Sequence, residues 1–257
     1  MHHAYIDHLA MGDSPLHRLD ARAKLAAVVA FTVAVVTVPR YELAALCPYA
    51  ILPFAWLAFG GVPLGFVARR LLIVSPFIAF VAAFNPLYDT APVLVRLGPW
   101  VFWIRGGVLS AATVCAKFVL TVSAIVALVS TTRFHDLLRA LAWFRLPRLF
   151  IIALSFLYRY LFLLVEQVQR LKRARECRAV GPPRLSASLH STGGIIGSLF
   201  LRTLERGERV HAAMAARGFD GSVRTLTRFR MRAADYAFLA ASALFLAALR
   251  LGAWGAI

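Results

Sequence analysis

The chain has 257 residues, of which 60% are hydrophobic and only 16% are charged, and its mean hydropathy is +0.72. Because a soluble domain contains about 25% charged residues and about 45–50% apolar ones, this composition excludes an ordinary water-soluble globule. The formal net charge is +17, and beside so much apolar sequence it favours contact with anionic lipid or an acidic partner surface over nucleic acid, for which no motif is present.

Six apolar runs divide the sequence. They are Leu25–Val38, Leu43–Phe59, Leu71–Leu87, Val108–Thr132, Leu149–Val165 and Tyr236–Leu249. A membrane-spanning helix needs about 20 mainly apolar residues, and the first run reaches this length only if it begins at Ala21. Asp20 is the expected N-cap of that helix. The second and third runs are expected to end at Gly60-Gly61 and at Asn85-Pro86.

Basic residues predict the orientation of these runs. If the first four runs each span once, one side of the membrane receives Arg18, Arg22, Lys24, Arg69, Arg70, Arg133, Arg139, Arg145 and Arg148. The loops on the other side hold only Arg40, Arg96 and Arg105. Because cytoplasmic loops carry an excess of Lys and Arg, we expect a multi-pass protein of the bacterial plasma membrane with a cytoplasmic N-terminus.

The run Leu149–Val165 raises a problem of parity. Of the 29 basic residues, 14 lie between Glu166 and Arg232, so this segment is also expected on the cytoplasmic side. Arg159 lies in the middle of the run, where a charge costs about 2.5–3.5 kcal/mol on insertion scales. We therefore expect Leu149–Val165 not to span, which leaves five spans; six spans in a different orientation is the alternative.

Four side chains invite an ion-binding interpretation. Lys117 lies inside the fourth run, either in an ion pathway or simply facing the bundle interior, and the absence of a carboxylate from that run favours the second interpretation. His2, His3 and His8 suggest a metal site, because imidazole is a good ligand for nickel and cobalt. A solvated terminus is the favoured interpretation of these histidines.

The basic segment after the fifth run has the pattern of two amphipathic helices. The first is expected to end near Gly181, because Pro182 and Pro183 follow it. The stretch Ser186–Ser198 is rich in serine and glycine, and a loop with a short helix is expected there. In the second helix one face is formed by residues that recur at helical spacing, namely Ile196, Phe200, Leu204, Gly207, His211 and Met214.

The end of the second helix combines an arginine with a glycine. Gly218 is the expected residue just beyond the helix, because glycine enters the left-handed conformation freely. Arg217 then lies where the helix dipole favours a cation. It either enters a groove of a partner or only caps its own helix.

Motifs for catalysis are missing from the sequence. Its only lysines are Lys24, Lys117 and Lys172, and none follows a glycine, so the chain has no phosphate-binding loop of the P-loop type. The apolar runs contain almost no carboxylate and no metalloprotease or serine-hydrolase motif. We therefore expect a protein that is not an enzyme and holds no cofactor of its own.

Three segments carry a resemblance to a known family. They are the opening stretch Met1–Leu25, the motif LYRYLFLLVE at Leu157–Glu166 and the motif ERVHAAMAARGF at Glu208–Phe219. Over nearly its whole length the chain resembles CbiQ, the transmembrane T component of energy-coupling-factor (ECF) ABC importers for cobalt. This resemblance implies an all-α polytopic protein with about five transmembrane helices and two cytoplasmic coupling helices.

The resemblance also implies site residues. In T components each coupling helix bears a short Ala-Arg-Gly-type motif that docks into an ATPase subunit. The second motif matches Ala216, Arg217 and Gly218. The first falls at Cys177, Arg178 and Ala179, where only the arginine agrees with the family pattern.

The implied partners are two ABC ATPase subunits (CbiO-like), which bind ATP, a metal-binding substrate-specific subunit (CbiM-like) and a small accessory membrane subunit (CbiN-like). The expected domains are residues 1–132 with four spans, 133–232 with the coupling helices, and 233–257 with the last span. A T component for nickel or a vitamin is an alternative. A membrane-embedded enzyme would need catalytic groups within the spans, and the sequence offers none.

Overall fold

The computed structural model describes residues 10–88, 92–97, 100–178, 185–221 and 231–254. Within these ranges the protein is helical, with one small β-hairpin, which confirms the prediction of an all-α polytopic fold. Its contacts form two units, residues 1–140 with 228–257 and residues 141–227. We call them the bundle unit and the arm unit, and we describe each by itself.

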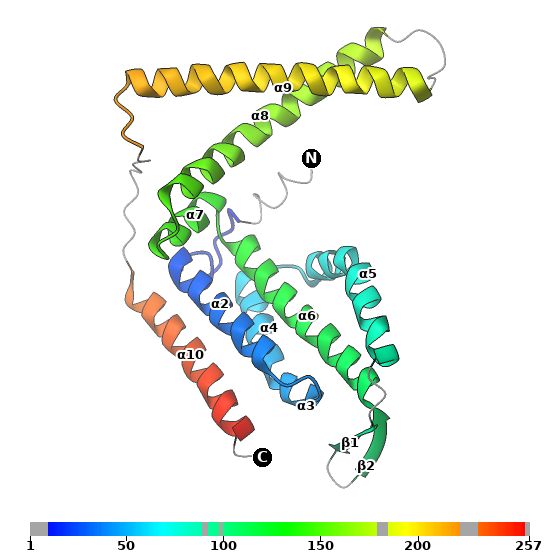
Figure 1. Ribbon diagram of the computed structural model, residues 1–257. Coiled ribbons are helices and arrows are strands. Elements are labelled where there is room, and N and C mark those ends of the chain that lie inside the picture. The colour runs from blue at the N-terminus through cyan, green and yellow to red at the C-terminus, as the bar shows by residue number, and fades with distance from the viewer. Residues whose placement is uncertain (1–9, 89–91, 98–99, 179–184, 222–230, 255–257) are drawn as a thin grey trace. The chain divides into compact units, whose positions relative to one another are not determined.

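The elements follow one another along the chain as Figure 1 shows. They are α2 (Ala21–Thr37), α3 (Leu43–Leu46), the 3-10 helix η1 (Pro48–Ala50), α4 (Ile51–Gly60), α5 (Leu64–Tyr88), β1 (Pro92–Leu97), β2 (Trp100–Arg105), α6 (Gly106–Thr131), α7 (Phe134–Trp143), α8 (Arg148–Arg178), α9 (Leu185–Ala216) and α10 (Ala233–Trp254).

The long helix α6 organises the bundle unit. It packs against α2, α4 and α5, while α10 packs along α2 (Figure 1). Phe31 of α2 is fully buried and meets Trp56 of α4 edge to face, with ring centroids 5.7 Å apart. Trp56 in turn contacts Phe238 of α10 at 6.0 Å. These aromatic contacts hold three helices that lie far apart in the sequence.

Local signals set most helix ends in the bundle unit. Asp20 caps α2 as predicted, because its carboxylate accepts a hydrogen bond from the backbone N–H of Arg22 at 2.9 Å. Gly61 ends α4 in the left-handed conformation, with φ 63°. The predicted limits of α5 were too narrow, since the helix begins at Leu64 and continues through Pro86. Figure 1 shows α5 changing direction along its length, and Pro76 inside the helix accounts for such a bend.

A hairpin that the sequence analysis did not anticipate joins α5 to α6. Strands β1 and β2 pair antiparallel, with Pro92 opposite Arg105 and Leu97 opposite Trp100. The β2 sequence WVFWIR is rich in aromatic and β-branched residues, which favour strands.

Among the described residues, five helical stretches have the length and apolar composition of a membrane span. They are Leu43–Gly60, Leu64–Leu87, Gly106–Thr131, Arg148–Arg178 and Ala233–Leu251. The number agrees with the prediction of about five, but the set differs, since α8 is included and α2, with only 17 residues, is not. This selection rests on length and composition alone, so the expectation that Leu149–Val165 does not span stays a prediction.

The arm unit contains the two longest helices, α8 with 31 residues and α9 with 32. Helix α9 runs without interruption through Ser186–Ser198, so the expected loop is wrong. The stretch holds no proline, and its glycines each cost a helix only about 1 kcal/mol relative to alanine. The expected helix end near Gly181 lies outside the described residues.

Candidate functional site

The predicted second motif lies at the C-terminal end of α9. Ala216 is the last helical residue, and Gly218 follows in the left-handed conformation with φ 76°. The N–H of Gly218 donates to the carbonyl of Ala215, and the N–H of Phe219 donates to that of Met214. These two bonds define a Schellman motif, which makes Arg217 the C-cap residue. Arg217 is exposed, so the helix end presents its guanidinium to the surroundings.

The predicted first motif lies at the end of α8. Arg178 is the last residue of this helix, and both Arg178 and Cys177 are exposed. Ala179 lies outside the described residues. Each candidate arginine therefore lies at the end of a long helix, and the second helix ends in a glycine-containing cap.

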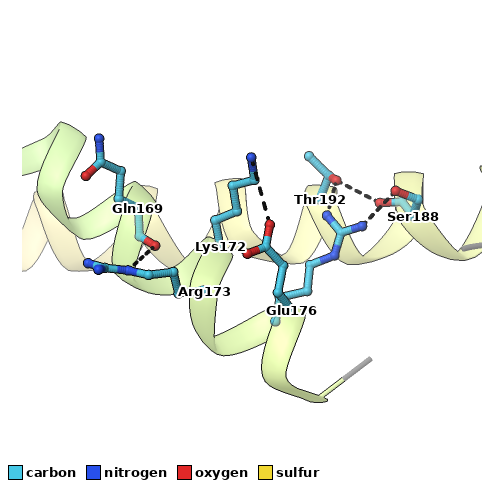
Figure 2. Close-up of polar contacts among 7 residues, drawn as sticks. Gln169, Lys172, Arg173, Glu176, Ser188 and Thr192 are labelled. Atoms are coloured by element: carbon cyan, nitrogen blue, oxygen red, sulfur yellow. Dashed lines mark hydrogen bonds and ion pairs between the residues drawn. The ribbon is translucent and has the colours of Figure 1, made fainter. Parts of the chain in front are cut away.

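Arg175, which the sequence analysis did not single out, ties the end of α8 to the start of α9. Its guanidinium donates to Thr192 Oγ1 at 2.9 Å and to Ser188 Oγ at 2.7 Å. Figure 2 shows these two acceptors side by side on α9. Thr192 Oγ1 donates in turn to the carbonyl of Ser188 at 2.7 Å. Arg175 precedes Arg178 by one helical turn, so these bonds fix the helix end that bears the first candidate arginine.

This link places the two candidate arginines at opposite ends of α9. Arg178 follows the turn of α8 that is bonded to the beginning of α9, whereas Arg217 follows the last residue of α9. A helix of 32 residues at 1.5 Å per residue is about 48 Å long. Two exposed cations separated by this length cannot serve a single small ligand, but they suit two contacts on large partners.

An apolar groove is lined mainly by side chains of α8 and α9. Its volume is about 610 Å³. Helix α8 contributes Leu149, Ile152, Phe156 and Leu163 among others, and α9 contributes Val210 and Met214. No residue of α8 is fully buried, so this long helix leaves its apolar side uncovered within the arm unit.

The other surface of the arm helices carries charge, as the spacing predicted. Glu166 and Arg170 form an ion pair at 2.6 Å, and Glu205 and Arg209 form one at 3.6 Å. All four side chains are mostly exposed, so each pair contributes well under 1 kcal/mol to stability. The arm unit is thus amphipathic, with an apolar groove and a solvated charged surface.

Lys117 has a structural role in the bundle unit. Its ammonium donates to the carbonyls of Val36, at 3.0 Å, and of Val38, at the C-terminal end of α2. A cation there satisfies carbonyls that have no partner within the helix. This agrees with the favoured interpretation that Lys117 faces the bundle.

Within the described parts of the chain, no three His, Cys, Asp or Glu side chains lie close enough together to hold a metal ion. His2, His3 and His8 lie outside those parts, so the metal interpretation of these histidines stays untested. The described site offers two exposed guanidinium groups, a pinned helix hairpin and an apolar groove. These three features together are typical of a docking surface.

The fold and site together define a multi-pass helical membrane protein with a long two-helix arm. The family model for the cobalt transport protein CbiQ matches residues 12–228, and the chain belongs to this family. It is 30% identical to the cobalt transport protein CbiQ of Rhodobacter capsulatus, over 77% of each chain.

Two further relatives widen the comparison. The chain is 28% identical to the energy-coupling factor transporter transmembrane protein EcfT of Listeria innocua, over 86% of each chain. It is 34% identical to the nickel permease LarQ of Lactiplantibacillus plantarum, over 41% of this chain and 38% of that one. The family and the EcfT relatives support a transmembrane component of an energy-coupling-factor transporter.

Proposed function

We propose that this chain is the energy-coupling scaffold of an ECF-type importer for cobalt, with Arg178 and Arg217 each docking into one of two ATPase subunits. The observation that carries the proposal is the placement of these two exposed arginines at opposite ends of α9, about 48 Å apart along the helix. Two separate partners, or two copies of one, fit this spacing better than a single site does.

The apolar groove between α8 and α9 supports the second half of the scaffold role. Docking of an apolar surface into such a groove is a common mode of helix recognition. We assign the groove to the substrate-specific membrane subunit, which binds the metal. ATP-driven movement of the two ATPases would then change the separation of the arm helices and reorient the subunit that rests on them.

The proposed orientation places the N-terminus and the arm unit in the cytoplasm, where the ATPases and ATP are found. The basic residues that precede α2 and the 14 between Glu166 and Arg232 support this choice. The same placement leaves the poorly charged loops, including the one with Arg40, on the outer side.

The proposal is tested by co-purification of the ATPase subunits with Arg178→Ala, Arg217→Ala and the double variant. Truncation of one partner of a desolvated ion pair costs about 2–5 kcal/mol, so each single variant should retain much less ATPase, and the double variant none. Arg209→Ala is the matched control, because Arg209 is exposed on the same helix and pairs only locally, with Glu205. Full retention of ATPase by the double variant would contradict the proposal.

Nickel is the second candidate substrate, because one relative is named a nickel permease. Uptake of radioactive cobalt and nickel by cells that express the complete complex separates the two. Preferential nickel uptake would replace cobalt in the proposal and leave the scaffold role unchanged.

A further inference from the structure

A buried lysine links α2 to the end of α6. Lys24 lies in the first turn of α2 and is only 4% exposed. Its ammonium donates to the backbone carbonyl of Thr131, the last residue of α6, at 2.8 Å. The helix end attracts the cation, because its final carbonyls are otherwise unpaired.

A buried aspartate links the same turn of α2 to the start of α10. Asp235 is 3% exposed, and its two carboxylate oxygens accept hydrogen bonds from the backbone N–H groups of Asp20 and Arg232, both at 2.7 Å. Asp20 and Asp235 are 215 positions apart in the sequence. A single carboxylate therefore fastens the beginnings of two helices to each other.

The buried ammonium of Lys24 is surrounded by acidic groups. Lys24 has three carboxylates as electrostatic partners, those of Asp136, Asp20 and Asp235. Each of the three lies at or near the first turn of a helix, namely α7, α2 and α10, where the helix dipole favours a negative charge. Lys24, Asp20 and Asp235 are buried and therefore depend on one another, because an unpaired buried charge is strongly unfavourable.

The cluster joins the helices between which the chain leaves the bundle unit and returns to it. The arm unit, residues 141–227, is an insertion in the bundle unit. The chain leaves toward it after α6 and α7, and it returns at α10. The end of α6, on the outgoing connection, and the start of α10, on the returning one, are thus both bonded to residues 20–24.

We propose that Lys24 and Asp235 are positioning residues that form a joint, through which movement of the arm unit reaches the membrane helices. This inference rests on the proposed coupling function. In this arrangement Lys24 holds the outgoing connection and Asp235 holds the returning one, so a displacement of either connection acts on α2.

Lys117 supplies the matched control. It also joins α6 to α2 through lysine–carbonyl bonds, but at the C-terminal end of α2. A substitution there tests whether any lost link between these two helices has the same effect. If the joint exists, substitution of Lys117 should not have this effect, since neither connection to the arm unit lies at the C-terminal end of α2.

The experiment uses the complete transporter in proteoliposomes and measures metal uptake per ATP hydrolysed. Lys24→Met and Asp235→Asn should assemble with the ATPases and hydrolyse ATP, while uptake per ATP falls by about tenfold, within the range of typical coupling energies. Lys117→Met should keep the wild-type ratio. Lys24→Arg should recover part of the loss, because a guanidinium preserves the charge and the donor.

Three outcomes would overturn the joint: a wild-type ratio in both joint variants, an equal fall in Lys117→Met, or loss of assembly in both joint variants while Lys117→Met assembles. The last would show a role in folding only. If Lys24→Met alone fails to assemble, the uptake per ATP of Asp235→Asn tests the joint instead. This variant is expected to assemble, because its amide keeps one acceptor oxygen. A wild-type complex that takes up no metal would instead overturn the proposed function, and the joint with it.

Discussion

Arg175 is the residue whose importance is least visible in the sequence. Its two hydrogen bonds to Ser188 and Thr192 cross from one helix to the next, whereas its neighbour Arg173 donates only to the carbonyl of Gln169 on its own helix (Figure 2). Nothing in a run of basic residues distinguishes the two, because the partners lie beyond the intervening prolines. The fold, and not the composition, selects Arg175.

We expect Arg175→Ala to loosen the start of α9. Each lost hydrogen bond is worth about 0.5–1.5 kcal/mol, so amide hydrogen exchange in the first turns of α9 should become faster by roughly tenfold. Arg173→Ala is the control and should leave this exchange unchanged. Equal protection in the two variants would show that Arg175 does not hold the hairpin.

Gly218 is a second residue whose backbone conformation matters. Its φ of 76° is unfavourable for residues with a Cβ, and alanine there should cost about 1–2 kcal/mol. We expect Gly218→Ala to fray the last turn of α9 and to weaken ATPase co-purification through misplacement of Arg217. Gly193→Ala, in the helical part of α9 where an added Cβ meets no atom within 4 Å, should retain the ATPase at the wild-type level.

At the scale of elements, the bundle unit depends on a few aromatic contacts between helices. Phe31 is fully buried against Trp56, whereas Val33 on the same helix is 60% exposed. We expect Phe31→Ala to lower stability by about 3–5 kcal/mol through the cavity that it leaves. Val33→Ala should change it little. Thermal unfolding in detergent, followed by tryptophan fluorescence, measures both, and similar transition temperatures would contradict this account of the core.

Local chemistry predicted most of the helices but not the contacts between them. The cap at Asp20 and the glycine at Gly218 could be read directly, because each acts within a few residues of the chain. The prediction of a loop at Ser186–Ser198 was wrong, since glycine and serine disfavour a helix only weakly and no proline interrupts this stretch.

The long-range bonds had no signal in the sequence. Lys24 counted there only as a charge that sets orientation, whereas in the structure it closes the end of α6. Its partner is a backbone carbonyl, which every residue has, so no pattern of side chains pointed to Thr131. The bond between Asp235 and Asp20 was hidden for a similar reason, since it joins positions 215 residues apart.

For the whole molecule, we predict that the end of α8 and the end of α2 lie on opposite sides of the membrane. The protein has three cysteines, and Cys177 is exposed next to Arg178. We expect a variant that keeps Cys177 alone to react with a membrane-impermeant maleimide in inside-out vesicles but not in intact cells. A cysteine-free chain carrying Arg40→Cys should react in the reverse manner, because this exposed residue follows the C-terminal end of α2. Labelling of both positions from one side would contradict the orientation.

Because α9 is an uninterrupted helix, its length also determines the direction in which Arg217 points relative to Arg178. Each residue added to a helix lengthens it by 1.5 Å and also turns everything beyond it by about 100°. One inserted residue would hardly change the distance between Arg178 and Arg217, yet it would rotate Arg217 by more than a quarter turn away from its proposed docking site. Insertion of about seven residues, close to two full turns, would nearly restore its heading. The length of α9 thus fixes both the distance between the two arginines and their relative direction around the helix axis.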